Sequence, residues 1–166
     1  MNEVLTFAVE KHITNNILSS FNKYKHNKSN LIDTDICNTN KGIQTNNVLD
    51  LNDFKEDVHF ERGLDYLINL IRRESGQSYL SFTWVHLVEY QRGGYQEWHN
   101  HQENENYSAI LYLNTCRGGE TQFESPHKTI SPIKNNMIVF PSRFNHCANK
   151  TSSWITKKKV LVMGIR

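Results

Sequence analysis

Short runs of aromatic and β-branched residues, separated by polar turns, fill the chain from residue 79 to its C-terminus. Such runs are typical of β-strands. Several short strands in succession favour an antiparallel sandwich or barrel, because that arrangement buries one face of each strand. The second half of the chain is therefore predicted to be a β-helix or jelly-roll core. The expected strands cover residues 79–90, 107–114, 119–124, 128–133, 137–141 and 158–165.

The first half of the chain carries helical patterns instead. Two apolar stripes at helical spacing predict one helix over residues 9–24 and a second that ends at Gly76, since glycine commonly closes a helix. Residues 25–50 are polar and are expected to form a loop. The stripes are Ile13, Ile17, Leu18 and Phe21, and Phe60, Leu64, Leu67, Ile68 and Ile71.

These patterns predict a single α+β domain over residues 1–166. Its core, residues 77–166, would be a double-stranded β-helix of the jelly-roll or cupin-like kind. Residues 1–76 would form a helical support packed outside the core, with the polar loop of residues 25–50 inside that support. At 166 residues, the chain is long enough to bury such a core without disulfide or metal staples.

Composition narrows the classes of function. The net charge of +2 is too balanced to predict nucleic-acid binding. The three cysteines, Cys37, Cys116 and Cys147, are widely spaced, so we expect neither a disulfide framework nor a zinc knuckle. The N-terminus lacks the pattern of a secretory signal, and no apolar run approaches the roughly 18 residues of a membrane span. A cytoplasmic protein without a membrane partner is expected.

Candidate metal ligands lie in the segment Glu89 to Glu103 and at His146. Gly93-Gly94 predicts a turn or bulge, and a strand after it would place His99 and His101 on one face, because residues two apart point the same way. His146 lies 47 residues beyond His99, a gap that suits a ligand from an opposite strand of a β-helix. Glu103 shares the parity of the two histidines. The spacing therefore leaves two triads open: His99, His101 and His146, or His101, Glu103 and His146.

These residues resemble the prolyl-hydroxylase-like branch of the 2-oxoglutarate/Fe(II) oxygenase superfamily. The similarity runs from about Leu80 to the C-terminus, and the segment around His99 also resembles short phage and bacterial oxygenases that carry H-x-H in place of H-x-D. This H-x-H pattern favours His101 at the carboxylate position. The motifs are Tyr90, Gly93-Gly94, His99-Asn100-His101, Tyr112-Leu113-Asn114, Gly118-Gly119-Glu120-Thr121-Gln122-Phe123, Phe140-Pro141, His146 and Lys159.

The resemblance implies roles for these residues. His99, His101 and His146 would be the metal-binding and catalytic residues. Lys159 would hold the distal carboxylate of 2-oxoglutarate, with Lys157 as the alternative and Lys158 facing outward. Tyr112 would reach the same carboxylate, and Tyr90 would lie near the metal-side carboxylate. Thr121 and Gln96 would line the pocket.

The implied activity is that of a dioxygenase that uses Fe(II), 2-oxoglutarate and O₂, with ascorbate as an optional cofactor. It would hydroxylate a peptide or small-molecule substrate, with a peptidyl proline as the first guess, and release succinate and CO₂. One alternative is a three-histidine thiol dioxygenase of the cupin type, which does not use 2-oxoglutarate. Another is a β-helix binding module without catalysis.

Overall fold

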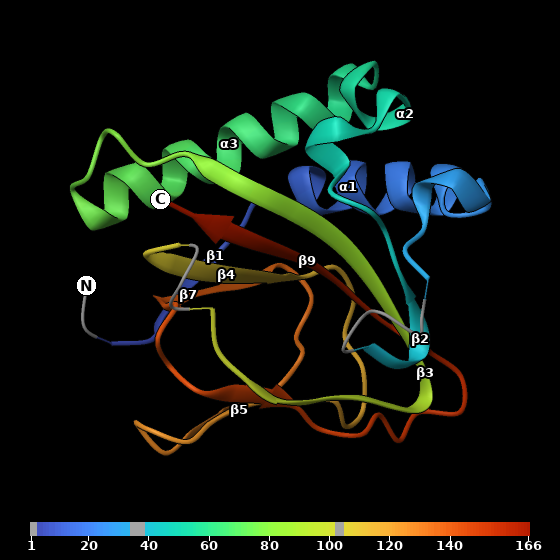
Figure 1. The fold of residues 1–166 in the computed structure, drawn as a ribbon, viewed down its shortest axis with the longest axis vertical. Coiled ribbons are helices and arrows are strands. Elements are labelled where there is room, and N and C mark those ends of the chain that lie inside the picture. The colour runs from blue at the N-terminus through green and yellow to red at the C-terminus, as the bar shows by residue number, and fades with distance from the viewer. Residues whose placement is uncertain (1–2, 34–38, 102–104) are drawn as a thin grey trace.

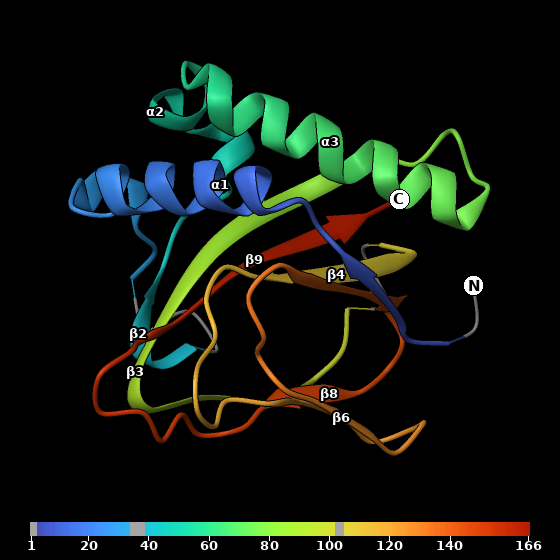
Figure 2. The same ribbon diagram turned by 180° about the vertical axis from the view of Figure 1, so that it is seen from behind.

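The computed structural model describes residues 3–33, 39–101 and 105–166. Its helices lie on one side of a curled β-sheet (Figures 1 and 2). The helical elements are α1 (Lys11–Tyr24), the 3-10 helices η1 (Lys28–Asn30) and η2 (Val48–Asp50), α2 (Asn52–Lys55) and α3 (Val58–Ser75). The strands are β1 (Leu5–Ala8), β2 (Thr39–Gln44), β3 (Phe82–His99), β4 (Tyr107–Tyr112), β5 (Thr121–Phe123), β6 (Lys128–Ile130), β7 (Asn136–Pro141), β8 (His146–Ala148) and β9 (Lys158–Ile165).

The described strands form one continuous sheet in the order β1-β7-β4-β9-β3-β8-β5-β6, and β2 pairs with β3 at the side. β3 bends from one layer into the other. Its first half pairs with β9, and its second half pairs with β8. The bend lies near Gly93, which has a positive φ of 76°, and Gly94, where an added Cβ would lie 2.7 Å from the Lys41 carbonyl oxygen. The predicted double-stranded β-helix core is confirmed.

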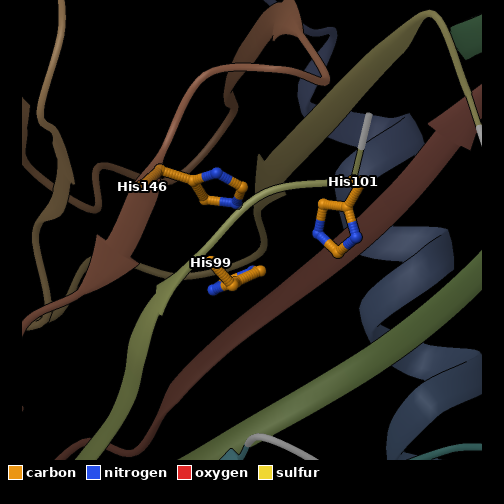
Figure 3. A group of neighbouring side chains, drawn as sticks. All are labelled: His99, His101 and His146. Atoms are coloured by element: carbon orange, nitrogen blue, oxygen red, sulfur yellow. The ribbon is translucent and has the colours of Figure 1, made fainter. Parts of the chain in front are cut away.

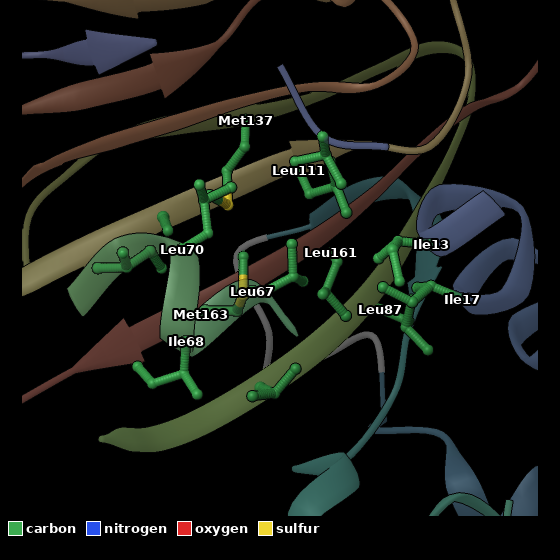
Figure 4. Close-up of a cluster of buried hydrophobic side chains, with 14 of the residues drawn as sticks. Ile13, Ile17, Leu67, Ile68, Leu70, Leu87, Leu111, Met137, Leu161 and Met163 are labelled. Atoms are coloured by element: carbon green, nitrogen blue, oxygen red, sulfur yellow. The ribbon is translucent and has the colours of Figure 1, made fainter. Parts of the chain in front are cut away.

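The two long helices cover the outer face of the β4–β9–β3 layer (Figure 2). Asp57 caps the N-terminus of α3, because its side chain accepts hydrogen bonds from the backbone N–H groups of His59 and Phe60, and Gly76 caps the C-terminus in the left-handed conformation. Both predicted helices are therefore present. Figure 4 shows their apolar stripes packed against the sheet: Ile13, Ile17, Leu67, Ile68 and Leu70 face Leu87, Leu111, Met137, Leu161 and Met163.

Three strands were not predicted. β2 lies within the segment expected to be a loop, and β1 pairs with β7 from the extreme N-terminal region. The sequence of β2, TNKGIQ, is polar because this strand lies beside β3 and is held by backbone pairing, without a buried apolar face. β8 has only three residues, too few to show an alternating pattern. Among the described residues, no helix is both long and apolar enough to cross a membrane.

Candidate metal centre

The structure brings His99, His101 and His146 together between the two layers of the sheet (Figure 3). His99 is the last residue of β3 and pairs directly with His146, the first residue of β8. His101 lies just beyond the strand, where its backbone N–H donates to the carbonyl of Ser142. One potential ligand atom from each ring lies within 4.8 Å of the others. The three side chains are therefore close enough to bind one metal ion.

The hydrogen bonds of the rings determine which nitrogen faces the centre. The Nδ1 atom of His99 lies 2.7 Å from the carbonyl oxygen of Glu97, and that of His146 lies 2.9 Å from the carbonyl oxygen of Phe144. A carbonyl oxygen only accepts, so each Nδ1 donates its proton and each Nε2 keeps a free lone pair. Metal-binding histidines are commonly held this way.

Burial keeps the histidines neutral, as a metal ligand requires. Loss of hydration, followed by repulsion from neighbouring histidines when these are protonated, lowers the pKa of His146 to about 3 and that of His101 to about 4. The same desolvation lowers the pKa of His99. Three neutral imidazoles are a donor set that iron, zinc, copper and nickel accept, so the residues fit the predicted Fe(II).

These depressed pKa values predict that the metal-free protein loses stability in acid. In the unfolded chain the histidines take up protons near pH 6.5, whereas folded His146 and His101 stay neutral until about pH 3 and 4. The unfolded state therefore binds more protons below pH 6.5, and each group costs up to about 1.4 kcal/mol of stability per pH unit. Urea denaturation of chelator-treated protein at pH 7 and pH 5 measures this loss.

A matched pair of variants isolates the contribution of the buried histidine. His146→Gln should show a shallower loss of stability between pH 7 and pH 5 than the wild type. His12→Gln should keep the wild-type loss, because the His12 side chain is 65% exposed. An unchanged pH dependence in His146→Gln would contradict the prediction.

A cavity of about 290 Å³ opens beside the three histidines. Trp84 and His86 of β3 form one wall, Ile32 and Gln44 lie at another, and Phe140 and Val162 contribute apolar surface. The Nδ1 atom of His86 lies 2.9 Å from the carbonyl oxygen of Thr45, as expected for a hydrogen-bonded histidine without ligand spacing. A second, narrow cavity of about 10 Å³ shares Gln96, Ile110, His146 and Val162 with the first and leads to Lys158.

Lys158 is the buried lysine of the basic run, and the expectation that it faces outward is wrong. Lys158 is 2% exposed and lies on the inner face of β9 with Val160. Its Nζ is 5.0 Å from the centre of the Tyr90 ring and 5.9 Å from that of Tyr112. No described carboxylate lies within ion-pairing distance, and desolvation lowers the pKa of the Lys158 ammonium to about 8.

Lys159 and Lys157 do not lie where a residue that holds the distal carboxylate of 2-oxoglutarate is expected. The Nζ of Lys159 donates to Asn22 of α1 at 2.8 Å and lies 3.6 Å from the buried Glu89 carboxylate. Lys157 is half-exposed and pairs with the same carboxylate at 3.1 Å, as does Lys25 at 2.8 Å. Neither Lys157 nor Lys159 lines the two cavities beside the histidines.

The other predicted pocket residues gather around Lys158. The Tyr112 hydroxyl donates to the Thr121 hydroxyl at 2.7 Å, and both residues are buried. The Tyr90 hydroxyl donates to the Gln96 side-chain oxygen at 3.3 Å. Tyr90, Gln96 and Thr121 line the narrow cavity. These positions place polar groups around one buried cation, next to the histidine cluster.

The remaining candidate ligand, Glu103, lies outside the described residues. Sequence reasoning missed a different carboxylate, Glu105, which is buried with one oxygen 3.7 Å from Nδ1 of His101. It also missed the role of Trp84, whose indole N–H donates to Glu105 at 3.1 Å. The available signal in the sequence was an acidic residue four positions after His101. The sequence does not show where the side chain of that residue lies relative to the histidine.

Comparisons with known proteins agree with this picture. The family model of the 2OG-Fe(II) oxygenase superfamily matches residues 85–164, which include every described residue of the histidine cluster and Lys158. No functionally curated protein is similar enough in sequence to count as a relative.

Solved prolyl hydroxylases share the fold at low sequence identity. A Pseudomonas putida prolyl-4-hydroxylase superposes with a TM-score of 0.75 at 14% identity, over 100% of this chain and 93% of that one. A viral collagen prolyl hydroxylase from Paramecium bursaria Chlorella virus-1, solved with 2OG, gives 0.70 at 14%, over 98% and 95%. A Trichoplax adhaerens prolyl hydroxylase with a hypoxia inducible factor peptide gives 0.71 at 16%, over 99% and 84%. Residues 85–164 are thus similar in sequence to the 2OG-Fe(II) oxygenase superfamily, within a chain that has the fold of these prolyl hydroxylases.

Proposed function

We propose that the protein is a 2-oxoglutarate-dependent Fe(II) dioxygenase in which His99, His101 and His146 hold the iron and Lys158 anchors 2-oxoglutarate. One observation carries the proposal: a buried lysine without an ionic partner among the described residues lies behind a cluster of three histidines, two of which, His99 and His146, keep their Nε2 atoms free. A thiol dioxygenase would have no 2-oxoglutarate for that lysine to hold.

The lysine and its neighbours account for recognition of the co-substrate. A buried ammonium is costly unless it is paired, so Lys158 favours a ligand that brings a carboxylate into the narrow cavity. The Thr121 hydroxyl, which lines the narrow cavity and accepts a hydrogen bond from the Tyr112 hydroxyl, would supply a further hydrogen bond. The metal-side end of 2-oxoglutarate would lie in the larger cavity near His146, which lines both spaces.

Each part of the chain then has a separate task. Fe(II) and 2-oxoglutarate, when bound, supply the oxidising chemistry that consumes O₂, releases succinate and CO₂ and delivers one oxygen atom to the substrate. The histidines hold the metal and leave positions open, as a catalytic site requires. The cavity walls of Trp84, Val162 and Phe140 shield the reaction from bulk water.

The larger cavity is the proposed substrate site. Its described lining carries no Asp, Glu, Lys or Arg, which favours an uncharged group on the substrate. A peptidyl proline is the first substrate to test, because the similar structures include prolyl hydroxylases. We place the enzyme in the cytoplasm, since the described cysteines, Cys116 and Cys147, are free thiols.

Anaerobic titration followed by exposure to oxygen tests this function. Protein loaded with Fe(II) should develop a visible absorption band when 2-oxoglutarate is added, and it should form succinate when O₂ is admitted. Samples without Fe(II) or without 2-oxoglutarate are the controls. Proline-containing peptides should increase the rate of succinate formation if they are substrates. Iron binding without an absorption band or succinate would favour a three-histidine dioxygenase that does not use 2-oxoglutarate.

A further inference from the structure

A buried carboxylate lies beside the histidine that takes the place of a carboxylate ligand. The Glu105 side chain is completely buried, and its Oε1 lies 3.7 Å from Nδ1 of His101. This oxygen has no hydrogen-bond partner among the described residues. A buried carboxylate oxygen without a partner is unfavourable, so its position calls for a donor that approaches in another state of the protein.

The surrounding structure holds Glu105 in place. Trp84 donates its indole N–H to the other carboxylate oxygen, Oε2, at 3.1 Å. The Trp84 ring fits because its partner on β9 is Gly164, where an added Cβ would lie 2.4 Å from the ring. Next to Glu105, the backbone N–H of Asn106 donates to Ile165 at 2.9 Å. A carboxylate held from two sides points its remaining oxygen toward His101.

The three histidines differ in what their Nδ1 atoms meet. His99 and His146 donate to neutral backbone carbonyls, whereas His101 faces a carboxylate. The His101 side chain is 28% exposed, so it has room for a small rotation. Such a rotation would shorten the 3.7 Å between its Nδ1 and Oε1 of Glu105 to a hydrogen bond. Hydrogen bonding to a carboxylate raises the basicity of an imidazole ligand and fixes its orientation.

The contact between Glu105 and His101 would place a negative charge close to the metal site. Three neutral imidazoles leave the full double charge of Fe(II) uncompensated, whereas two histidines and a carboxylate would cancel half of it. We propose that Glu105 is a positioning residue for the metal centre, which accepts the Nδ1–H of His101, turns its Nε2 to the metal and supplies the missing negative charge from outside the ligand set. This inference rests on the proposed metal site.

Metal affinity tests the proposal without any turnover. Glu105→Gln keeps the shape and an acceptor oxygen but removes the charge, and it should weaken Co(II) binding about 10–100-fold, the usual effect of losing such a partner. Competition against a chelating dye measures the affinity. Glu61→Gln, an exposed change on α3, should bind Co(II) as the wild type does. Thermal unfolding of the metal-free variants shows whether each is folded.

In a second background, Glu105→Gln is expected to have the opposite effect on Co(II) affinity. In His101→Asp the metal gains a carboxylate ligand, so a second buried carboxylate at residue 105 becomes repulsive. Adding Glu105→Gln to His101→Asp should then tighten Co(II) binding. Trp84→Phe, which removes the donor to Oε2, should weaken binding in the wild type and add little to Glu105→Gln, because both act through one contact.

The outcomes separate this inference from the proposed function. Wild-type Co(II) affinity in a folded Glu105→Gln would overturn the role of Glu105 and leave the three-histidine site standing. Weakening by Glu105→Gln in both backgrounds would also overturn it, because the effect would then not depend on charge at residue 101. Absence of Co(II) and Fe(II) binding in the wild type would instead overturn the proposed function itself.

Discussion

Replacing His146 with alanine is expected to abolish iron binding and, with it, the conversion of 2-oxoglutarate to succinate. His146 is the proposed ligand from the second layer of the sheet, so its loss would leave only the two neighbouring histidines of the proposed triad. Structural zinc sites gain about 10–16 kcal/mol from their ligands together, so losing one of three ligands should weaken binding at least about 100-fold. Iron retained after desalting and succinate formed in air measure the two effects.

The substitution also disturbs packing, which requires a control. The His146 ring lies edge-on to Phe140 with ring centres 4.8 Å apart and is 5% exposed, so alanine leaves a void. The substitution also has a stabilising effect in acid, because metal-free His146→Ala no longer buries an imidazole whose pKa is lowered by burial. Thermal unfolding of metal-free samples separates folding from metal binding. His127→Ala, which alters an exposed histidine, should retain iron. Full iron occupancy in folded His146→Ala would refute the assignment.

The sequence predicted the elements whose side chains alone determine them. The α3 stripe and Gly76 marked a helix with its end, and the run before Pro141 marked β7, because a buried face requires a regular apolar pattern. His99 and His101 were predicted to converge through strand parity. The structure has them converge although β3 ends at His99 and His101 lies beyond it. The convergence depends on the bond from His101 to Ser142, which spacing along the chain does not reveal.

The assignment of the lysine failed for a physical reason. β9 is a central strand that is buried on both faces, with Val160 facing the other layer and Leu161 facing the helices. A strand with two apolar faces has no amphipathic alternation, so parity cannot tell which of Lys158 and Lys159 points inward. The bent path of β3 and the position of α1 decide it, because Asn22 of α1 and Glu89 of β3 bind Lys159 on the outer face.

Replacing Lys158 with methionine is expected to have two opposite effects. Binding of 2-oxoglutarate to the Fe(II)-loaded protein should fall at least about 100-fold, because the distal carboxylate would be buried without its cation, a change that costs about 3–5 kcal/mol. The ligand-free protein should become more stable at pH 7. A lysine whose pKa is lowered to about 8 opposes folding, and methionine of similar length removes this cost, on the order of 2–3 kcal/mol.

The pH dependence distinguishes a lost charge from better packing. Between about pH 8 and pH 10.4, the unfolded wild type holds a proton on Lys158 that the folded protein has released, so wild-type stability rises with pH there. The advantage of Lys158→Met should therefore be largest below pH 8 and shrink toward pH 10. Urea denaturation at pH 7 and pH 10 measures it, and anaerobic calorimetry measures 2-oxoglutarate affinity.

Lys159→Met is the matched control, because it makes the same change on the opposite face of the same strand. It should destabilise the protein, since it removes the bond to Asn22 and one of the cations around Glu89, and it should leave the affinity for 2-oxoglutarate unchanged. The reverse result, with affinity lost in Lys159→Met and kept in Lys158→Met, would return the anchoring role to Lys159. It would also mean that the inner face of β9 does not bind the co-substrate.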